Sequence, residues 1–227
     1  MSATPSVYVI NLERRTDRRR AMQSELLRVG WEAFFFRAIQ PSSSAGFDSI
    51  GARGCFLSHL SVLKAARDAR VRRLVILEDD VNFVRDFEAR WRSAMTELDV
   101  LDWSICYPGH AISNLPLGLS PVAPETSVLC AHFMVINNSA VDSLVEGLET
   151  ILARPAGHPM GGPMHVDGAY STIRRQNRAL KTFAVFPVLG HQRPSRTDIR
   201  RGAWFDRLSM LEPVVSAIRK VKGAWRA

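Results

Sequence analysis

The sequence of 227 residues has few cysteines and no long apolar run. Its cysteines, Cys55, Cys106 and Cys130, are widely spaced and form no CxxC pair, which argues against a disulfide framework and against a zinc site. No run of about 18 apolar residues occurs, so no segment is typical of a transmembrane helix. The start, MSATPSVYVINL, lacks the basic and apolar regions of a signal peptide. We therefore expect a soluble, cytoplasmic protein.

Basic residues outnumber acidic ones, and the net charge is +8. This balance favours an anionic partner, such as a nucleic acid, a phosphorylated small molecule or an acidic membrane surface. The sequence lacks the interleaved basic and aromatic residues of RNA-binding motifs and has no zinc-finger spacing. We therefore expect no nucleic-acid partner.

Strand and helix patterns alternate along the chain, which predicts an α/β fold with a Rossmann-type, mostly parallel sheet flanked by helices. Expected strands cover 7–12, 31–39, 74–77, 102–109, 127–136 and 180–190, and expected helices end before Gly30 or cover 56–69, 87–98 and 139–152. Residues 40–54, 108–124 and 153–165 have loop composition, and Asn138 or Ser139 is expected to cap the fourth helix. We expect one domain over 1–207 and a basic amphipathic segment over 208–227.

Three adjacent carboxylates, Glu78, Asp79 and Asp80, follow the apolar run 74–77. If the chain stays extended there, Glu78 and Asp80 share one side and Asp79 faces the other. Two hard oxygen donors on one side suit Mg²⁺ or Mn²⁺. The alternative is a solvated acidic turn.

Five arginines crowd residues 14–20, at the expected start of the first helix. Positive charge opposes the helix dipole there, by roughly 0.3–1 kcal/mol per charge, so the arrangement costs stability unless an anion binds. A diphosphate would be held by backbone N–H groups and guanidinium groups together. In open α/β sheets ligands bind at the carboxyl ends of strands, where Asn11, the three carboxylates and His191 are expected. The alternative is a solvated basic face.

Three segments, VINLERRTDRRR, GARGCFLSH and VILEDDV, resemble in order and wording the markers of glycosyltransferase family 25. That family includes bacterial lipooligosaccharide galactosyltransferases and collagen galactosyltransferases. The resemblance continues more weakly through HFMVINNSAVDSL, HVDGAY and FPVLGHQ, and so covers about residues 5–200. It implies a GT-A-like fold, a UDP-sugar donor and a divalent cation, Mn²⁺ or Mg²⁺. It also implies inverting transfer of a hexose, for which galactose is the expectation, to a glycan or glycolipid.

The resemblance also implies site residues. Asp80 would be the direct metal ligand, Glu78 would lie near the ribose or the metal water, and His191 would be a further metal or phosphate ligand. Ser58 and His59 would bind the nucleotide or brace the acidic segment, although a purely structural histidine is the alternative for His59. The full set of expected donor-binding residues is Asn11, Leu12, Arg14, Arg15, Arg18, Gly54, Ser58, His59, Glu78 and Asp79.

An inverting transfer needs a base for the acceptor hydroxyl, and Asp167 of HVDGAY is the candidate. The alternative is that Asp167 caps the following helix. The C-terminal segment 208–227 combines apolar and basic residues, which is typical of peripheral contact with an anionic membrane, although a helix packed on its own domain has the same pattern. A metal-dependent phosphohydrolase or nucleotidyltransferase would use similar carboxylates and arginines, and remains the competing function.

Overall fold

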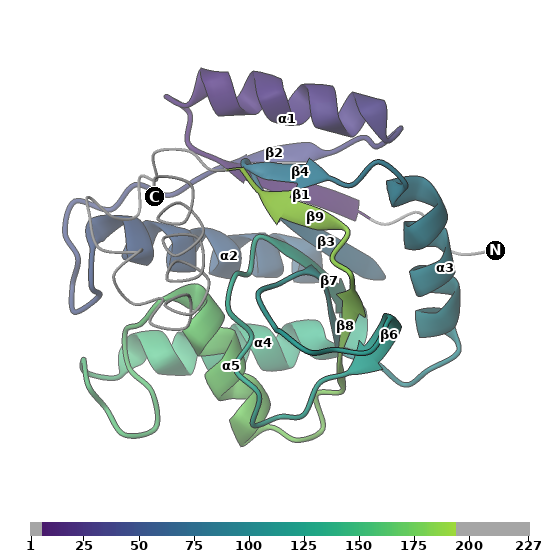
Figure 1. The fold of residues 1–227 in the computed structure, drawn as a ribbon. Helices are drawn as coiled ribbons and strands as arrows, with labels where there is room; N and C mark the ends of the chain where they lie inside the picture. The colour runs from purple at the N-terminus through teal and green to yellow at the C-terminus, as the bar shows by residue number, and fades with distance from the viewer. Residues whose placement is uncertain (1–5, 194–227) are drawn as a thin grey trace, which may run out of the picture. The chain divides into compact units, whose positions relative to one another are not determined.

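The computed structural model describes residues 6–193, which contain a seven-stranded sheet, a two-stranded sheet and five helices (Figure 1). The strands are β1 Ser6–Asn11, β2 Phe34–Arg37, β3 Arg73–Glu78, β4 Val81–Phe83, β5 Ile105–Gly109, β6 Gly118–Pro121, β7 Phe133–Asn137, β8 Thr182–Phe186 and β9 Gly190–Gln192. The helices are α1 Thr16–Arg28, α2 Ile50–Asp68, α3 Phe87–Asp99, α4 Asn138–Ala153 and α5 Val166–Gln176.

The large sheet has the strand order β2-β1-β3-β7-β5-β8-β6. The pairs β1–β2, β1–β3 and β5–β8 are parallel, and β3–β7, β5–β7 and β6–β8 are antiparallel. Five strands therefore run in one direction, and only β7 and β6 oppose them among the described residues. The expected α/β fold with a mostly parallel sheet flanked by helices is confirmed.

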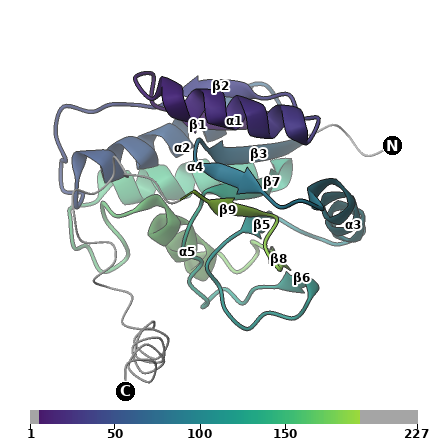
Figure 2. The same ribbon diagram turned by 45° about the horizontal axis from the view of Figure 1, so that its top comes forward.

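Helices cover both faces of this sheet (Figures 1 and 2). On one face, side chains such as Val9, Leu77 and Val135 form a buried core with Met22 and Leu26 of α1 and with the apolar residues of α3. The opposite face is covered by α2 and α4, which run side by side, and by α5 next to α4 (Figure 2). Because β3 is covered on both faces, residues 74–77 are wholly buried, as a continuous apolar run predicts.

Helix α2 begins at Ile50, so the expected loop over 40–54 is wrong in its last five residues. Ser49 caps this helix, because its side chain accepts the Ala52 N–H at 3.0 Å. The composition of 40–54 concealed the helix start. As a result Gly54 and Cys55 lie in α2, and Cys55 is about one helical turn before His59.

Other boundaries also differ from the expectation. The expected strand over 127–136 begins only at Phe133, and the expected loop over 108–124 contains β6. The cap of α4 is Asn137, whose side chain accepts the Ser139 N–H at 3.2 Å, rather than Asn138 or Ser139. The pair β4–β9 was not expected. It joins residues more than 100 positions apart, and each strand has three residues.

No helix within residues 6–193 is both long and apolar enough to cross a bilayer. The expected membrane-binding segment 208–227 and the expected domain boundary at 207 lie outside the described residues. Both stay predictions.

Candidate active site

The site is built where two parallel neighbours, β1 and β3, end at the same edge of the sheet. Ile10 is opposite Glu78 in the register, so Asn11, the last residue of β1, reaches the residue after β3. The Asn11 Nδ2 donates to Asp79 Oδ2 at 2.7 Å, and both side chains are buried. Asn11 and the acidic segment therefore meet, as the carboxyl-end rule predicts for them.

Asp79 and Asp80 form a turn between β3 and β4. The alternation that would pair Glu78 with Asp80 requires an extended chain, and the strand ends at Glu78. Instead one arginine joins the two aspartates: an Arg18 terminal nitrogen lies 2.9 Å from Asp79 Oδ1 and 3.5 Å from Asp80 Oδ2. Arg18 comes from the first turn of α1, as the sequence suggested for an arginine of this cluster.

Strand β9 and the residue after it brace the same turn from the other side. The Arg193 backbone N–H donates to the Asp80 carbonyl at 2.7 Å, and its guanidinium donates to the Asp79 carbonyl at 2.8 Å. Gln192 Nε2 donates to Glu78 Oε2 at 3.3 Å. His191 itself is exposed and pairs through its backbone with Asn82. The sequence argument missed Arg193, and the Gln192 that ends FPVLGHQ was the signal that pointed to this strand.

Burial and mutual repulsion control the carboxyl groups of the turn. Burial, followed by the charge of Glu78, raises the pKa of Asp80 to about 7, against the opposing effect of Arg18. Burial also raises the pKa of Asp79, although Asn11 and Arg18 oppose the rise. Burial by itself raises the pKa of Glu78, but the neighbouring His59, His132 and Arg18 outweigh it, so the pKa lies below its usual value. Burial thus disfavours the charged forms of Asp79 and Asp80 unless a further positive group is near.

One oxygen of this turn fits a cation. Asp80 Oδ1 is buried and has no hydrogen-bond partner, which is a costly state for a carboxylate unless something positive approaches it. Hard divalent cations such as Mg²⁺ and Mn²⁺ take carboxylate oxygens as ligands. The residues present therefore fit the expected metal, which Asp80 would hold.

Arg14 is exposed and Arg15 is half-buried, and both have partners outside the acidic turn. Arg14 donates to Gln40 Oε1 at 2.7 Å, and Arg15 pairs with Asp17 at 2.8 Å. Leu12 is half-buried, and its carbonyl accepts the Arg15 N–H at 2.8 Å. Among the arginines expected to bind the donor, Arg18 is the one that contacts the acidic turn.

The residues expected from GARGCFLSH lie on one buried stretch of α2. A Cβ atom at Gly54 would lie 2.6 Å from the Ile39 carbonyl oxygen, so this glycine permits close contact with the chain's own backbone. Ser58 accepts the Ile39 N–H at 2.8 Å and donates to the Gly54 carbonyl at 2.7 Å. His59 lies with Nε2 3.9 Å from Glu78 Oε1. Gly54 and Ser58 therefore position α2 against the segment after β2, and His59 faces the end of β3.

Asp167 is the second residue of α5, whose N-cap is His165, so the alternative that Asp167 caps the helix is wrong. Its Oδ1 accepts the N–H of Gly168 at 2.8 Å, and its Oδ2 accepts the N–H of Cys130 at 3.2 Å. It thereby braces the segment that leads into β7. The charge of Asp167 contributes, after burial and Glu78, to a raised pKa of Cys55.

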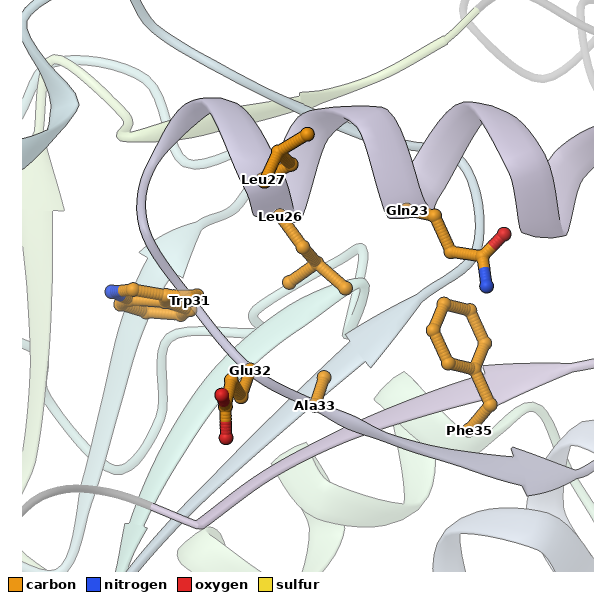
Figure 3. A pocket seen from close by; sticks show the side chains of 7 residues that line it. All are labelled: Gln23, Leu26, Leu27, Trp31, Glu32, Ala33 and Phe35. Atoms are coloured by element: carbon orange, nitrogen blue, oxygen red, sulfur yellow. The ribbon is translucent and has the colours of Figure 1, made fainter.

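An open hollow of about 400 Å³ lies elsewhere, between α1 and the segment that leads into β2 (Figure 3). Leu26 of α1 projects toward Trp31 and Phe35 across the hollow, and Leu27 also lines it. Arg19 stacks over Phe35 at 4.5 Å from the ring centre. None of the residues expected to bind a donor or a metal lines this hollow, so the acidic turn and the hollow are separate features.

Comparison with known proteins identifies one family. Residues 4–108 match glycosyltransferase family 25, described as an LPS biosynthesis protein, and this range contains all three sequence motifs. Procollagen galactosyltransferase 2 of Homo sapiens is 31% identical over 215 residues, which cover 81% of this chain and 34% of the human protein. The chain thus spans about one third of that relative's length. The resemblance to family 25 is confirmed.

Two further matches are a relative described as inactive and a solved structure. An inactive glycosyltransferase 25 family member 3 of Homo sapiens is 30% identical over 131 residues, covering 48% of this chain and 22% of that protein. Among solved structures, a mutant Drosophila β-1,4-galactosyltransferase 7 in complex with manganese, UDP-Gal and xylobiose has a TM-score of 0.40 and 10% identity. That match covers 92% of this chain and 80% of the other.

Proposed function

Residues 4–108 match glycosyltransferase family 25, and on that premise we propose that this chain transfers a hexose, galactose, from a UDP-sugar to a hydroxyl of a glycan or glycolipid. Procollagen galactosyltransferase 2 of Homo sapiens, which is 31% identical over 215 residues, transfers galactose by its name, which supports that donor. The proposed transfer inverts the anomeric carbon and depends on a divalent cation, Mn²⁺ or Mg²⁺. Lipopolysaccharide is the acceptor class that the family description supports.

The observation that carries the proposal is the acidic turn. Asp79 and Asp80 share the Arg18 guanidinium, yet Asp80 Oδ1 is buried without a partner. A diphosphate bound with a divalent cation presents both negative and positive charge, and this sheet edge has groups of both signs. In the proposed complex the carboxylates hold the cation, and the arginine holds the phosphate oxygens. Asp80 is the proposed ligand, with Glu78 beside it and His191 as a further candidate.

The chain's own residues divide the binding work. Arg18 and Arg193 already lie at the turn, and their guanidinium groups supply positive charge for a diphosphate. Asn11 fixes the Asp79 carboxylate, which leaves Asp80 as the carboxylate with an open oxygen. When bound, the cation would neutralise the leaving diphosphate. Arg14, Arg15 and Leu12 stay candidates for the outer part of the donor site.

Asp167 is the proposed base. Its oxygens accept one backbone N–H each, and an ionised carboxylate has lone pairs left to accept a proton. In the proposed reaction the acceptor oxygen forms a bond to the anomeric carbon, the bond from that carbon to the UDP oxygen breaks, and the acceptor proton passes to Asp167. The segment 208–227 is proposed to bring the enzyme to a membrane that carries a glycolipid acceptor.

One experiment tests the proposal stepwise. Thermal unfolding of the full chain is followed with UDP, UDP-galactose, UDP-glucose and CMP-sugars, each with and without Mn²⁺, because a ligand of the folded state raises the melting temperature. UDP-galactose with Mn²⁺ is expected to give the largest rise. One human relative is described as inactive, so the second step measures galactose incorporated into lipopolysaccharide or glycan acceptors. Stabilisation by CMP-sugars alone, or phosphate release without sugar transfer, would overturn the proposal.

A further inference from the structure

Three side chains of metal-ligating type meet behind the acidic turn: Cys55, His59 and Glu78. Cys55 and His59 are four residues apart on α2 and so lie on the same helix face, while Glu78 ends β3. The Glu78 Oε1 atom lies 3.8 Å from Cys55 Sγ and 3.9 Å from His59 Nε2. One potential ligand atom from each residue lies within 4.8 Å of the other two.

The Cys55–Glu78 separation allows a weak S–H···O hydrogen bond, whereas the His59–Glu78 separation is too long for an N–H···O bond, and both are slightly longer than the distances between ligand atoms around a metal ion. The 3.9 Å between Glu78 Oε1 and His59 Nε2 exceeds the roughly 2.7–3.2 Å of an ordinary N–H···O bond. Around a tetrahedral Zn²⁺, with bonds of about 2.0 Å to nitrogen or oxygen and about 2.3 Å to sulfur, neighbouring ligand atoms are roughly 3.3–3.7 Å apart. Small rotations of the three side chains would close the gap.

A second observation is independent of the distances. His59 is fully buried, and its Nε2 atom has no hydrogen-bond partner although it faces Glu78. A buried ring nitrogen without a partner is unfavourable unless a ligand reaches it. The other ring nitrogen, Nδ1, lies 3.3 Å from the Tyr170 hydroxyl. If Nδ1 carries the proton and the Tyr170 oxygen accepts it, the Nε2 lone pair points into the cluster.

The surroundings of the cluster already hold its ligands. Metal-binding histidines usually donate their second ring N–H to a fixed acceptor, and the Tyr170 hydroxyl is positioned to be that acceptor for His59. Gln192 Nε2 donates to Glu78 Oε2 at 3.3 Å and leaves Oε1 facing Cys55 and His59. Two of the three ligand side chains are therefore oriented by a neighbour before any cation arrives.

We propose that Cys55, His59 and Glu78 bind one divalent cation of the zinc type, with a water molecule as the fourth ligand. Thiolate, imidazole and carboxylate together suit Zn²⁺ or Co²⁺, whereas Mn²⁺ and Mg²⁺ prefer oxygen ligands alone. The site is thus chemically distinct from Asp80, and it stands independently of the proposed transfer. A cation there would tie α2 to the end of β3 and fix Glu78 beside the acidic turn.

The absence of a CxxC pair argued against zinc in the sequence, but that argument considers only ligands close in the chain. Here Glu78 is 19 residues from His59, and the two meet because α2 packs on β3. The missed helix start at Ile50 also hid the relation between Cys55 and His59. The spacing within one helix, C-x₃-H, becomes a signal only once the helix is recognised.

Titration of the full chain with Co²⁺ tests the site, because a cobalt–thiolate bond gives a charge-transfer absorption in the near ultraviolet. The parent chain is expected to bind one Co²⁺ with this band, and Zn²⁺ is expected to remove the band by displacement. Cys55→Ser is expected to abolish it, and His59→Gln to weaken Co²⁺ binding by about tenfold or more. Cys130→Ser, which changes another half-buried thiol, is the matched control and is expected to keep the band.

No band in the parent chain, a band that persists in Cys55→Ser, or a band lost in Cys130→Ser would overturn the proposal. Circular dichroism checks that each variant is folded. If Cys55→Ser does not fold, the loss of Co²⁺ affinity in His59→Gln tests the site instead. Asp80→Asn is expected to keep the cobalt band. Failure of this cation site therefore leaves the Mn²⁺-dependent binding of UDP untouched, and failure of the UDP test leaves the cobalt result standing.

Discussion

Arg18 lies between Asp79 and Asp80, 2.9 Å from one carboxylate and 3.5 Å from the other. This pairing joins the first turn of α1 to the turn after β3, and Arg18 and Asp79 are 61 residues apart in the sequence. The basic helix start and the three adjacent carboxylates are each clusters of like charge, and the pairing explains how each stabilises the other. It also places an arginine where a diphosphate would meet the acidic turn.

Replacing Arg18 with Ala is expected to weaken binding of UDP with Mn²⁺ by about 1.5 kcal/mol or more, the scale of a charged hydrogen bond. Isothermal titration calorimetry measures this change in UDP affinity. Arg20→Ala is the matched control, because Arg20 is on the same helix and exposed, and it is expected to bind UDP as the parent does. Equal affinity in the Arg18 and Arg20 variants would mean that Arg18 only neutralises the turn.

Arg14 and Arg15 provide a graded comparison. Both are at the surface end of the cluster, where Arg14 contacts Gln40 and Arg15 contacts Asp17. Charge screening by solvent is stronger there, so replacing either with Ala is expected to reduce UDP affinity less than replacing Arg18. Titrations at low and high salt check this order. A larger loss at Arg14 or Arg15 than at Arg18 would move the diphosphate outward from the turn.

Asp167→Asn is expected to lower transfer by about 10² or more, because the amide cannot accept the acceptor proton. UDP affinity is expected to change little, since Asp167 acts on the acceptor side. Because Asp167 also accepts the Cys130 and Gly168 N–H groups, the free energy of unfolding is measured in parallel. Transfer at the parent rate would exclude Asp167 as the base and leave its role as the brace of the segment before β7.

Glu25 links α1 to β4, since its Oε2 accepts the Phe83 N–H at 2.9 Å and pairs with Arg28 at 2.6 Å. Burial raises the pKa of Glu25, but Arg28 and the Phe83 N–H outweigh it, so the pKa lies below its usual value. A carboxyl group with a lowered folded-state pKa stabilises the fold above its unfolded pKa. That contribution disappears as the pH falls through the lowered value.

Glu25→Gln is therefore expected to reduce the free energy of unfolding by about 1–2 kcal/mol at pH 7. The difference from the parent should shrink as the pH is lowered through the carboxyl range. Urea unfolding at several pH values measures it, and Glu88→Gln, at an exposed pair with Arg92, is the control. A difference that stays constant with pH would attribute the loss to packing instead of charge.

Much of the site followed from one rule about sheets. Asn11 and the acidic residues were expected to meet because they end strands that run in the same direction, and β1 and β3 are indeed parallel neighbours. The rule could be applied because residues 74–77 are a continuous apolar run, which is consistent with a buried strand.

Other parts depended on contacts that no local pattern carries. Whether Glu78 and Asp80 share a side depended on where β3 ends, and the turn at Asp79 and Asp80 broke the alternation. Arg193 reaches the turn through the pairing of β4 with β9, two strands of three residues each that have too few positions to show a period. The start of α2 depended on one serine side chain, Ser49, within a stretch of loop composition.

The measurement that tests the account most directly is calorimetric titration of UDP into the full chain and into Asp80→Asn, each with and without Mn²⁺. The parent chain is expected to bind UDP tightly only with Mn²⁺, and Asp80→Asn is expected to lose this dependence while staying folded. Asp102→Asn, at an exposed aspartate away from the turn, is the control and should match the parent. Parent-like, Mn²⁺-dependent binding of UDP by Asp80→Asn would contradict a metal site at Asp80.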